Sequence, residues 1–220
     1  MKVKLQLNHL KKDVDKLQRL HGNPKLNAIY GAGCVRNPKI LFLFMNPTAR
    51  NISSFPDWKG LRAPWIGTKN IWKLLNSLKI LNDQLFEVIQ DGSGDIWTYS
   101  FAFAVYDELN KKSVYITNLA KCTQDDARGL KDKIFREYLV NTLEEIYEIN
   151  PSKIISFGNQ VSSILLNKKV QVSDYQGNKK ETLELKDKIF NIYPVYYPIG
   201  QGMRNINKAI NRINSVIRSR

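Results

Sequence analysis

Hydrophobic residues follow a helical period in some parts of the chain and form short unbroken runs in others, and the two patterns alternate. Leu7, Leu10, Val14, Leu17 and Leu20 predict an N-terminal helix over about 5–21. Unbroken apolar runs, typical of strands buried on both faces, occur at about 39–45, 113–118, 153–158 and 192–197. Helical spacing returns at about 71–78, 131–149, 161–166 and from about 204 onward.

Alternating strands and helices are typical of βαβ units, in which helices cover both faces of a parallel sheet. We therefore expect one α/β domain over residues 1–220, a three-layer α/β/α sandwich with a central, mostly parallel four-stranded sheet. Residues 82–112 fit this alternation least well. We interpret them as an insertion that carries a turn at 91–95 and either a hairpin or a helix.

Composition narrows the class of protein. A hydrophobic fraction of 43% argues against disorder, and two cysteines argue against a disulfide scaffold. The sequence has no apolar run near the roughly 20 residues of a membrane span, and its start, MKVKLQLNHLKK, does not resemble a secretory leader. We expect a cytoplasmic monomer that does not bind a membrane. The net charge of +14 favours a polyanionic partner, nucleic acid first, although a generally basic proteome would give the same charge.

Candidate chemistry lies at the predicted carboxyl ends of the strands, where parallel α/β sheets bind ligands. Asn46 and Asn118 each follow a strand, and a carboxamide suits the edge of a nucleobase. The alternative is that both asparagines satisfy backbone groups in turns. The two histidines and two cysteines form no zinc pattern, and neither a Walker motif nor G-x-G-x-x-G is present. The acidic pair Asp125 and Asp126 is either a site or, more commonly, a solvated loop.

Four segments, in this order, resemble the uracil-DNA glycosylase superfamily, and the nearest group is family 4. They are YGAGCVRNPKILFLFMNP (30–47), GLRAPWIG (60–67), VYITNLAKC (114–122) and PSKIISFG (151–158). The likeness extends over most of residues 29–212. It implies an enzyme that hydrolyses the N-glycosidic bond of a base flipped out of DNA.

The resemblance also implies a role for each matching residue. Asn46 and Tyr197 would be catalytic, the first positioning water and the second replacing the family's hydrogen-bonding histidine. Trp65 would stack on the base, Asn118 would read its Watson–Crick edge, and Met45 and Pro47 would line the pocket. The residues implied to contact DNA are Lys121, Gly200, Gln201, Met203, Arg204 and Lys208. Arg204, Lys208 and Arg212 recur every four residues and predict one basic stripe.

The sequence departs from the family at its metal site. The family's iron–sulfur cluster needs four cysteines, but this chain has only Cys34 and Cys122. We therefore expect no cluster, no other metal and no cofactor.

Together these features predict a monofunctional glycosylase of base-excision repair, acting on uracil or another deaminated base in single- or double-stranded DNA. Two alternatives stay open: a non-catalytic nucleic-acid-binding relative, and a hydrolase for a different damaged base or a free nucleoside.

Overall fold

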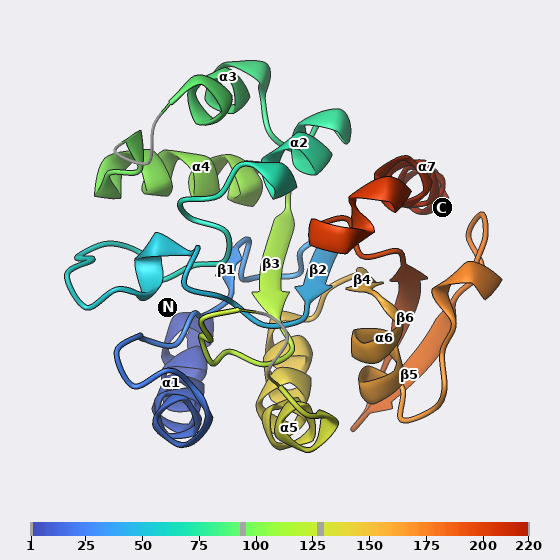
Figure 1. The fold of residues 1–220 in the computed structure, drawn as a ribbon. Coiled ribbons are helices and arrows are strands. Elements are labelled where there is room, and N and C mark those ends of the chain that lie inside the picture. The colour runs from blue at the N-terminus through green and yellow to red at the C-terminus, as the bar shows by residue number, and fades with distance from the viewer. Residues whose placement is uncertain (1, 93–95, 127–129, 220) are drawn as a thin grey trace.

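Four parallel strands form the centre of the fold in the computed structural model, which describes residues 2–92, 96–126 and 130–219, without the side chains of residues 2–6 and 201. In chain order they are β2 (Ile40–Phe44), β3 (Val114–Asn118), β4 (Lys153–Phe157) and β6 (Lys188–Val195). They pair in the order β3-β2-β4-β6 (Figure 1). All four strands were predicted from their apolar runs, although the last begins and ends earlier than expected.

Two edge strands were not predicted, so the described residues form a mixed six-stranded sheet and not a four-stranded one. Strand β1 (Ala32–Gly33) pairs antiparallel with β3, and β5 (Glu181–Leu185) pairs antiparallel with β6. The first is only two residues long. The second alternates half-buried and exposed positions, because one face of this edge strand is open to solvent.

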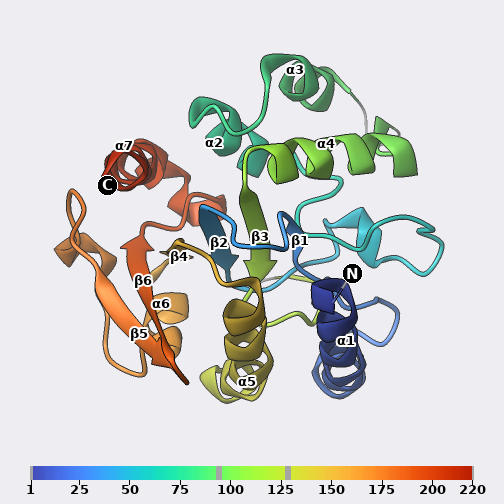
Figure 2. The ribbon, with the colours of Figure 1, turned by 180° about the vertical axis from the view of Figure 1, so that it is seen from behind.

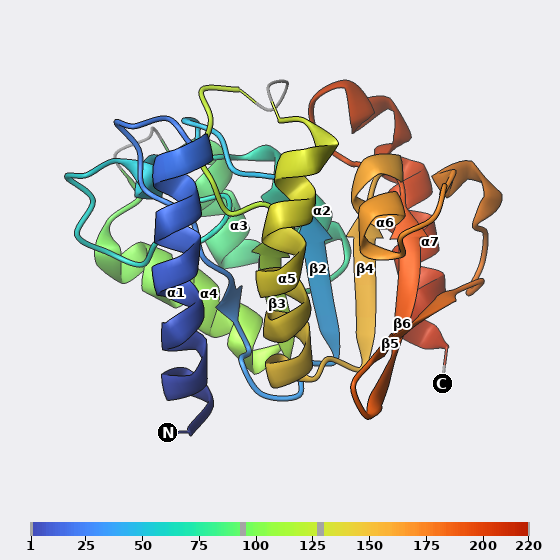
Figure 3. The same ribbon diagram turned by 90° about the horizontal axis from the view of Figure 1, so that it is seen from below.

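Helices cover both faces of the sheet. One face carries α1 (Lys2–His21), α5 (Asp132–Ile149) and α6 (Asn159–Leu165), which stand in front of the strands in Figure 3. The other face carries α2 (Asn70–Ser77), α4 (Tyr99–Lys111) and α7 (Ile206–Arg218), above the sheet in Figures 1 and 2. The three-layer arrangement is therefore as predicted.

The insertion is helical and contains no hairpin within its described residues. It forms α3 (Asp83–Asp91), which packs on α2, and α4. The side chains of Asn82 and Thr98 accept hydrogen bonds from the backbone N–H groups of Leu85 and Phe101, so each helix begins at a side-chain cap. Part of the predicted turn at 91–95 lies outside the described residues.

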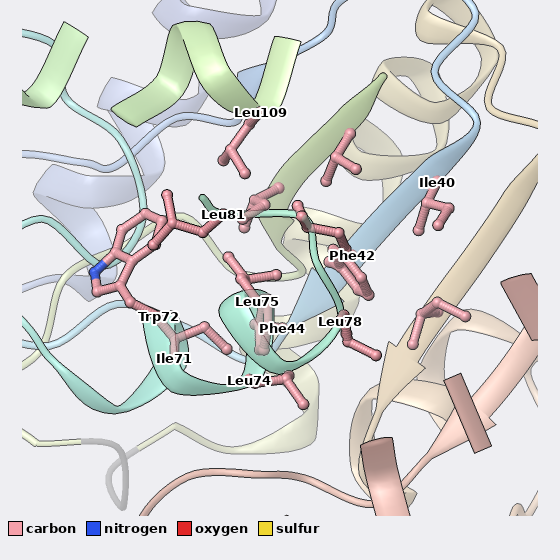
Figure 4. Close-up of a cluster of buried hydrophobic side chains, with 14 of the residues drawn as sticks. Ile40, Phe42, Phe44, Ile71, Trp72, Leu74, Leu75, Leu78, Leu81 and Leu109 are labelled. Carbon is pink, nitrogen blue, oxygen red and sulfur yellow. The ribbon is translucent and has the colours of Figure 1, made fainter. Parts of the chain in front are cut away.

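The pleat of β2 divides the core. Phe42 and Phe44 point to the layer of α2 and α7, whereas Leu41 and Leu43 point to the layer of α1 and α5. Figure 4 shows the first cluster, in which side chains of α2 close over the two phenylalanines. Alternate residues of one strand thus serve two cores, and this explains the unbroken apolar run in the sequence.

Among the described residues, no helix combines the length and the hydropathy that crossing a membrane requires.

Candidate functional site

The two asparagines lie at neighbouring strand ends. Strands β2 and β3 pair in parallel with Phe44 opposite Asn118. The pairing continues beyond the strands, where the N–H of Leu119 donates to the Phe44 carbonyl at 2.8 Å and the N–H of Ala120 to the Met45 carbonyl at 3.0 Å. The backbone register therefore fixes the Asn118 turn beside the residues that lead into Asn46.

Both asparagines are buried, and in each the carboxamide oxygen has no hydrogen-bond partner among the described residues. Asn46 is 4% exposed and Asn118 is 2% exposed. Among the described residues, the Asn46 side chain makes one hydrogen bond, from Nδ2 to the Pro47 carbonyl at 3.1 Å. An unpaired buried acceptor costs about 1–3 kcal/mol, so turn satisfaction does not account for these oxygens. Two orphaned acceptors at adjacent strand ends indicate a binding site.

Trp65 has a strained backbone and a buried indole N–H. Its φ of 73° is in the left-handed region, which a bulky residue rarely occupies. The Trp65 carbonyl accepts from the Thr68 N–H at 3.1 Å, the Thr68 hydroxyl at 2.8 Å and Trp72 Nε1 at 3.3 Å, and these bonds hold the conformation. Nε1 of Trp65 has no partner among the described residues. Strain combined with an unpaired donor is typical of functional positions.

Phe44 connects the predicted site residues. Its ring stacks on Phe157 at 4.4 Å between centroids and meets the edges of Trp65 at 5.0 Å and Tyr197 at 6.3 Å. Because Phe44 and Asn118 are register partners in parallel strands, their side chains share a face of the sheet. Trp65, Tyr197 and Asn118 thus lie around one aromatic floor, with Asn46 two residues beyond Phe44 in the chain.

Sequence reasoning missed Phe44 and Phe157, since both were treated only as core residues of strands. The available signal was their position near the end of each apolar run, at the sheet edge that binds ligands. Each is the last residue of its strand, and the residues before them, Leu43 and Ser156, are register partners.

Tyr197 follows β6 and approaches the site over two glycines. A Cβ on Gly158, whose φ is 87°, would lie 3.6 Å from the Tyr197 Cβ, and one on Gly202 would overlap the Tyr197 carbonyl oxygen. Desolvation raises the pKa of the Tyr197 hydroxyl well above its usual range, although the side chain as a whole is partly exposed. The group is therefore a neutral hydrogen-bond donor at physiological pH.

Lys121 is not at the surface, so we replace the predicted DNA contact with a structural role. Its side chain is only 4% exposed and pairs with Glu145 Oε2 at 2.7 Å. The ammonium also donates to the Asn118 carbonyl at 2.5 Å and to the Thr142 hydroxyl at 3.2 Å. A charge this well paired is unavailable to phosphate. If the Lys121 ammonium moved to the surface, the buried Glu145 carboxylate would lose its ion-pair partner.

Glu145 completes a buried network beneath the Asn118 turn. Its carboxylate also accepts from the Tyr115 hydroxyl at 2.7 Å and the Thr117 hydroxyl at 3.1 Å. Thr117 and Tyr115 belong to β3, and Glu145 belongs to α5. Helix α5 thereby fixes the end of β3 from the face opposite Phe44.

The remaining predicted residues divide between the interior and the surface. Met45 packs into the cluster of α1 and α5, on the other face from Phe44, so its side chain does not line this site. Pro47 is buried, and its carbonyl accepts from Asn46 and from the Gln124 N–H. Arg212 is also buried, so the predicted basic stripe is wrong at this position.

The predicted DNA loop forms the 3-10 helix η4 (Gly200–Asn205), which leads into α7. Gly200 and Arg204 are exposed and Met203 is partly exposed, while the side chain of Gln201 lies outside the described part. Lys208 is exposed on the first turns of α7. The structure thus leaves Met203, Arg204 and Lys208 accessible on the side of Tyr197.

Three further titratable residues were considered as candidates for chemistry: His21, Asp125 and Cys122. His21 bonds to Glu137 at 2.6 Å, and Asp125 accepts from the Asn23 amide at 2.7 Å. Burial raises the pKa of the Cys122 thiol, which is therefore neutral. Across residues 2–92, 96–126 and 130–219, no three His, Cys, Asp or Glu side chains gather in a metal-ligating group.

Comparison with models of known protein families gave no match, and comparison with curated proteins gave no significant match. The case for a function therefore depends on the geometry of this site: two orphaned carboxamide oxygens around a floor of aromatic rings.

Proposed function

We propose that the protein is a DNA glycosylase of the uracil-DNA glycosylase type, which hydrolyses the N-glycosidic bond of uracil or another deaminated base flipped out of DNA. The observation that carries this proposal is the pair of buried, unpartnered oxygens on Asn46 and Asn118 at adjacent strand ends. The resemblance of four segments to that superfamily and the net charge of +14 support it.

The orphaned groups select a kind of base. Oδ1 of Asn118 is an acceptor, so it suits a base with a ring N–H on its Watson–Crick edge. Uracil and hypoxanthine present such an N–H, whereas cytosine presents an unprotonated ring nitrogen there. Trp65, which is partly exposed and meets the buried Phe44 edge to face, would provide the apolar face against which a flipped base stacks.

Each catalytic step then has a residue. Oδ1 of Asn46 would accept a hydrogen bond from the water that attacks C1′ of the sugar. As the C1′–N bond breaks, its electron pair passes to the base, and the Tyr197 hydroxyl would donate a hydrogen bond to the base oxygen where that charge collects. The attacking water loses its proton to solvent, since an asparagine is not a base at neutral pH.

Incubation with uracil-containing oligonucleotides, followed by alkaline cleavage of abasic sites, tests the proposal. We expect strand breaks at uracil with the wild-type protein and a loss of about tenfold to 100-fold in Asn46→Ala, because the attacking water is no longer held. Asn141→Ala, which changes a half-buried asparagine on α5 away from the site, is the control and should cleave normally. No product with uracil, hypoxanthine or xanthine would refute the proposal.

The pH dependence separates Tyr197 from a histidine. Burial raises the pKa of Tyr197, so its hydroxyl keeps the proton, and the single-turnover rate should be flat between about pH 6 and pH 9. Tyr197→Phe should lower the rate about 100-fold at every pH, which is the usual effect of losing one oxyanion-type donor. A rate that changes across the histidine range, near pH 6.5, would contradict this role.

A non-catalytic nucleic-acid-binding protein is the second candidate. The observation that favours it is the position of both histidines on α1, where His21 bonds to Glu137 and lies away from the strand ends. Binding of uracil-containing DNA without any product would support this function.

A further inference from the structure

A recess lies at the carboxyl end of β6, next to Tyr197 in the chain. Its volume is about 390 Å³, and it is lined mainly by polar, basic and aromatic residues. They come from the loop before β5, from the residue after β6 and from α7: Tyr175, Gly177, Tyr196, Lys208, Asn211 and Arg212. We refer to these six residues as the Tyr196 groove. In Figure 1 α7, seen end-on, lies above the tip of β6, and the loop before β5 lies to the right of both.

The wall of the groove is rigid. Arg212 donates to the carbonyls of Pro194 at 2.7 Å, Gly177 at 2.9 Å and Lys179 at 2.6 Å, and so ties the loop before β5 to α7. Tyr175 is buried, and its hydroxyl donates to Glu181 at 2.6 Å. Because these side chains are already bonded within the protein, their role is to shape the groove.

Tyr196 and Lys208 are the aromatic and the basic side chains of the groove that a ligand can reach. Tyr196 is partly exposed, Lys208 is exposed, and the Lys208 ammonium lies 5.4 Å from the centroid of the Tyr196 ring. An aromatic ring beside an exposed cation is the combination that binds unpaired nucleotides, because the base stacks on the ring and the cation pairs with the phosphate. Asn211 adds an exposed carboxamide at the same place.

The groove adjoins the proposed base pocket. Tyr196 immediately precedes Tyr197, whose ring lies 6.3 Å from that of Phe44 between centroids, so the Cα atoms of the two tyrosines are about 3.8 Å apart. A strand that places one base beside Tyr197 would therefore carry a neighbouring nucleotide past Tyr196. Within a duplex that neighbour stays paired with the opposite strand and stacked on its other side, so it does not turn its face to a tyrosine.

We propose that the Tyr196 groove holds an unpaired nucleotide next to the flipped base, and that the substrate of this protein is single-stranded DNA. This inference rests on the proposed function for the identity of the flipped base. The groove itself is a binding site that needs no damaged base, so it can be tested separately.

Binding of a fluorescent oligothymidine and of a fully paired duplex, both without uracil, tests the groove by anisotropy. Tyr196→Leu, which keeps apolar volume but removes the ring, should weaken single-strand binding about tenfold and duplex binding less than twofold. Tyr196→Phe keeps the ring and should bind as the wild type does. Lys208→Gln should reduce the slope of log affinity against log salt by about 0.7 on the single strand.

The protein contains a matched control at the opposite end of β6. Lys186 lies 4.1 Å over the ring of Tyr147, whose hydroxyl bonds to Asp187 in the turn before β6. Tyr147→Leu and Lys186→Gln thus remove an aromatic ring and a neighbouring ammonium at a place distant from the groove. Single-strand affinity should stay within twofold of the wild type. Thermal melting of each variant shows that it is folded.

Several results would overturn the proposal: equal losses on single strand and duplex, losses in the Tyr147 control as large as in Tyr196→Leu, or an effect of Lys208→Gln with none of Tyr196→Leu. The last result would indicate phosphate contact without stacking. Failure of the proposed function is distinguishable, because it would appear as absent excision of uracil with the groove effects on binding intact.

Discussion

Replacing Asn118 by leucine is expected to abolish base excision without destabilising the fold. The carboxamide oxygen is buried and unpartnered among the described residues, so removing it leaves no protein group unpaired. The free energy of unfolding should stay unchanged or rise by about 1 kcal/mol. The rate of excision should fall about 1000-fold or more, because the N–H on the base edge would face a hydrocarbon. Urea melts and single-turnover cleavage measure the two quantities.

Asn51 is the control for this experiment. It is also 4% exposed, but its amide donates to the Ala63 carbonyl at 2.7 Å and its oxygen accepts from the backbone and the hydroxyl of Ser53. Asn51→Leu should therefore lower the free energy of unfolding by about 1–3 kcal/mol, since the buried polar groups of Ala63 and Ser53 lose their hydrogen-bond partner. An Asn118→Leu variant that loses as much stability as this, or that still excises uracil, would show that Asn118 has a structural role only.

Removing the Glu145 carboxylate is expected to have the largest effect on stability. Glu145→Ala leaves the buried Lys121 ammonium without its ion pair and the hydroxyls of Tyr115 and Thr117 without their acceptor. Breaking such a pair from one side should lower the free energy of unfolding by about 3–5 kcal/mol. Denaturant unfolding of the wild type and the variant gives the difference.

The neighbouring residue on the same helix provides a control. Glu144 pairs with Lys186 at 3.0 Å, but the Lys186 side chain is 55% exposed. Glu144→Ala should cost less than about 1 kcal/mol, because solvent screens an exposed pair. The double variant Lys121→Met with Glu145→Leu should recover most of the lost stability, since it buries no charge. If it recovers none, the loss in Glu145→Ala reflects packing and not an uncompensated charge.

The site could be predicted from the sequence only to the extent that its residues follow strands. Asn46 and Asn118 stand directly after apolar runs, and parallel strands bring their carboxyl ends to one edge. Trp65 and Tyr197 were predicted through the resemblance alone, since nothing in a loop sequence indicates where its side chains will point. For the same reason the predicted DNA contact of Lys121 and the predicted pocket position of Met45 were wrong. The residue type of a basic or apolar position in a loop does not specify on which face of the sheet its side chain lies.

The sequence by itself determined the α/β class, the four central strands and most helices, because these depend on local periodicity and on the burial that each period implies. It did not reveal the two edge strands, since β1 is two residues long and the alternation in β5 spans only five residues, with Leu183 and Leu185 as its apolar members. Only the tertiary structure decided which polar groups have partners. Hydrogen bonding between Lys121, Glu145 and Asn118, and the lack of a described partner for the Asn118 oxygen, depend on contacts between segments distant in sequence.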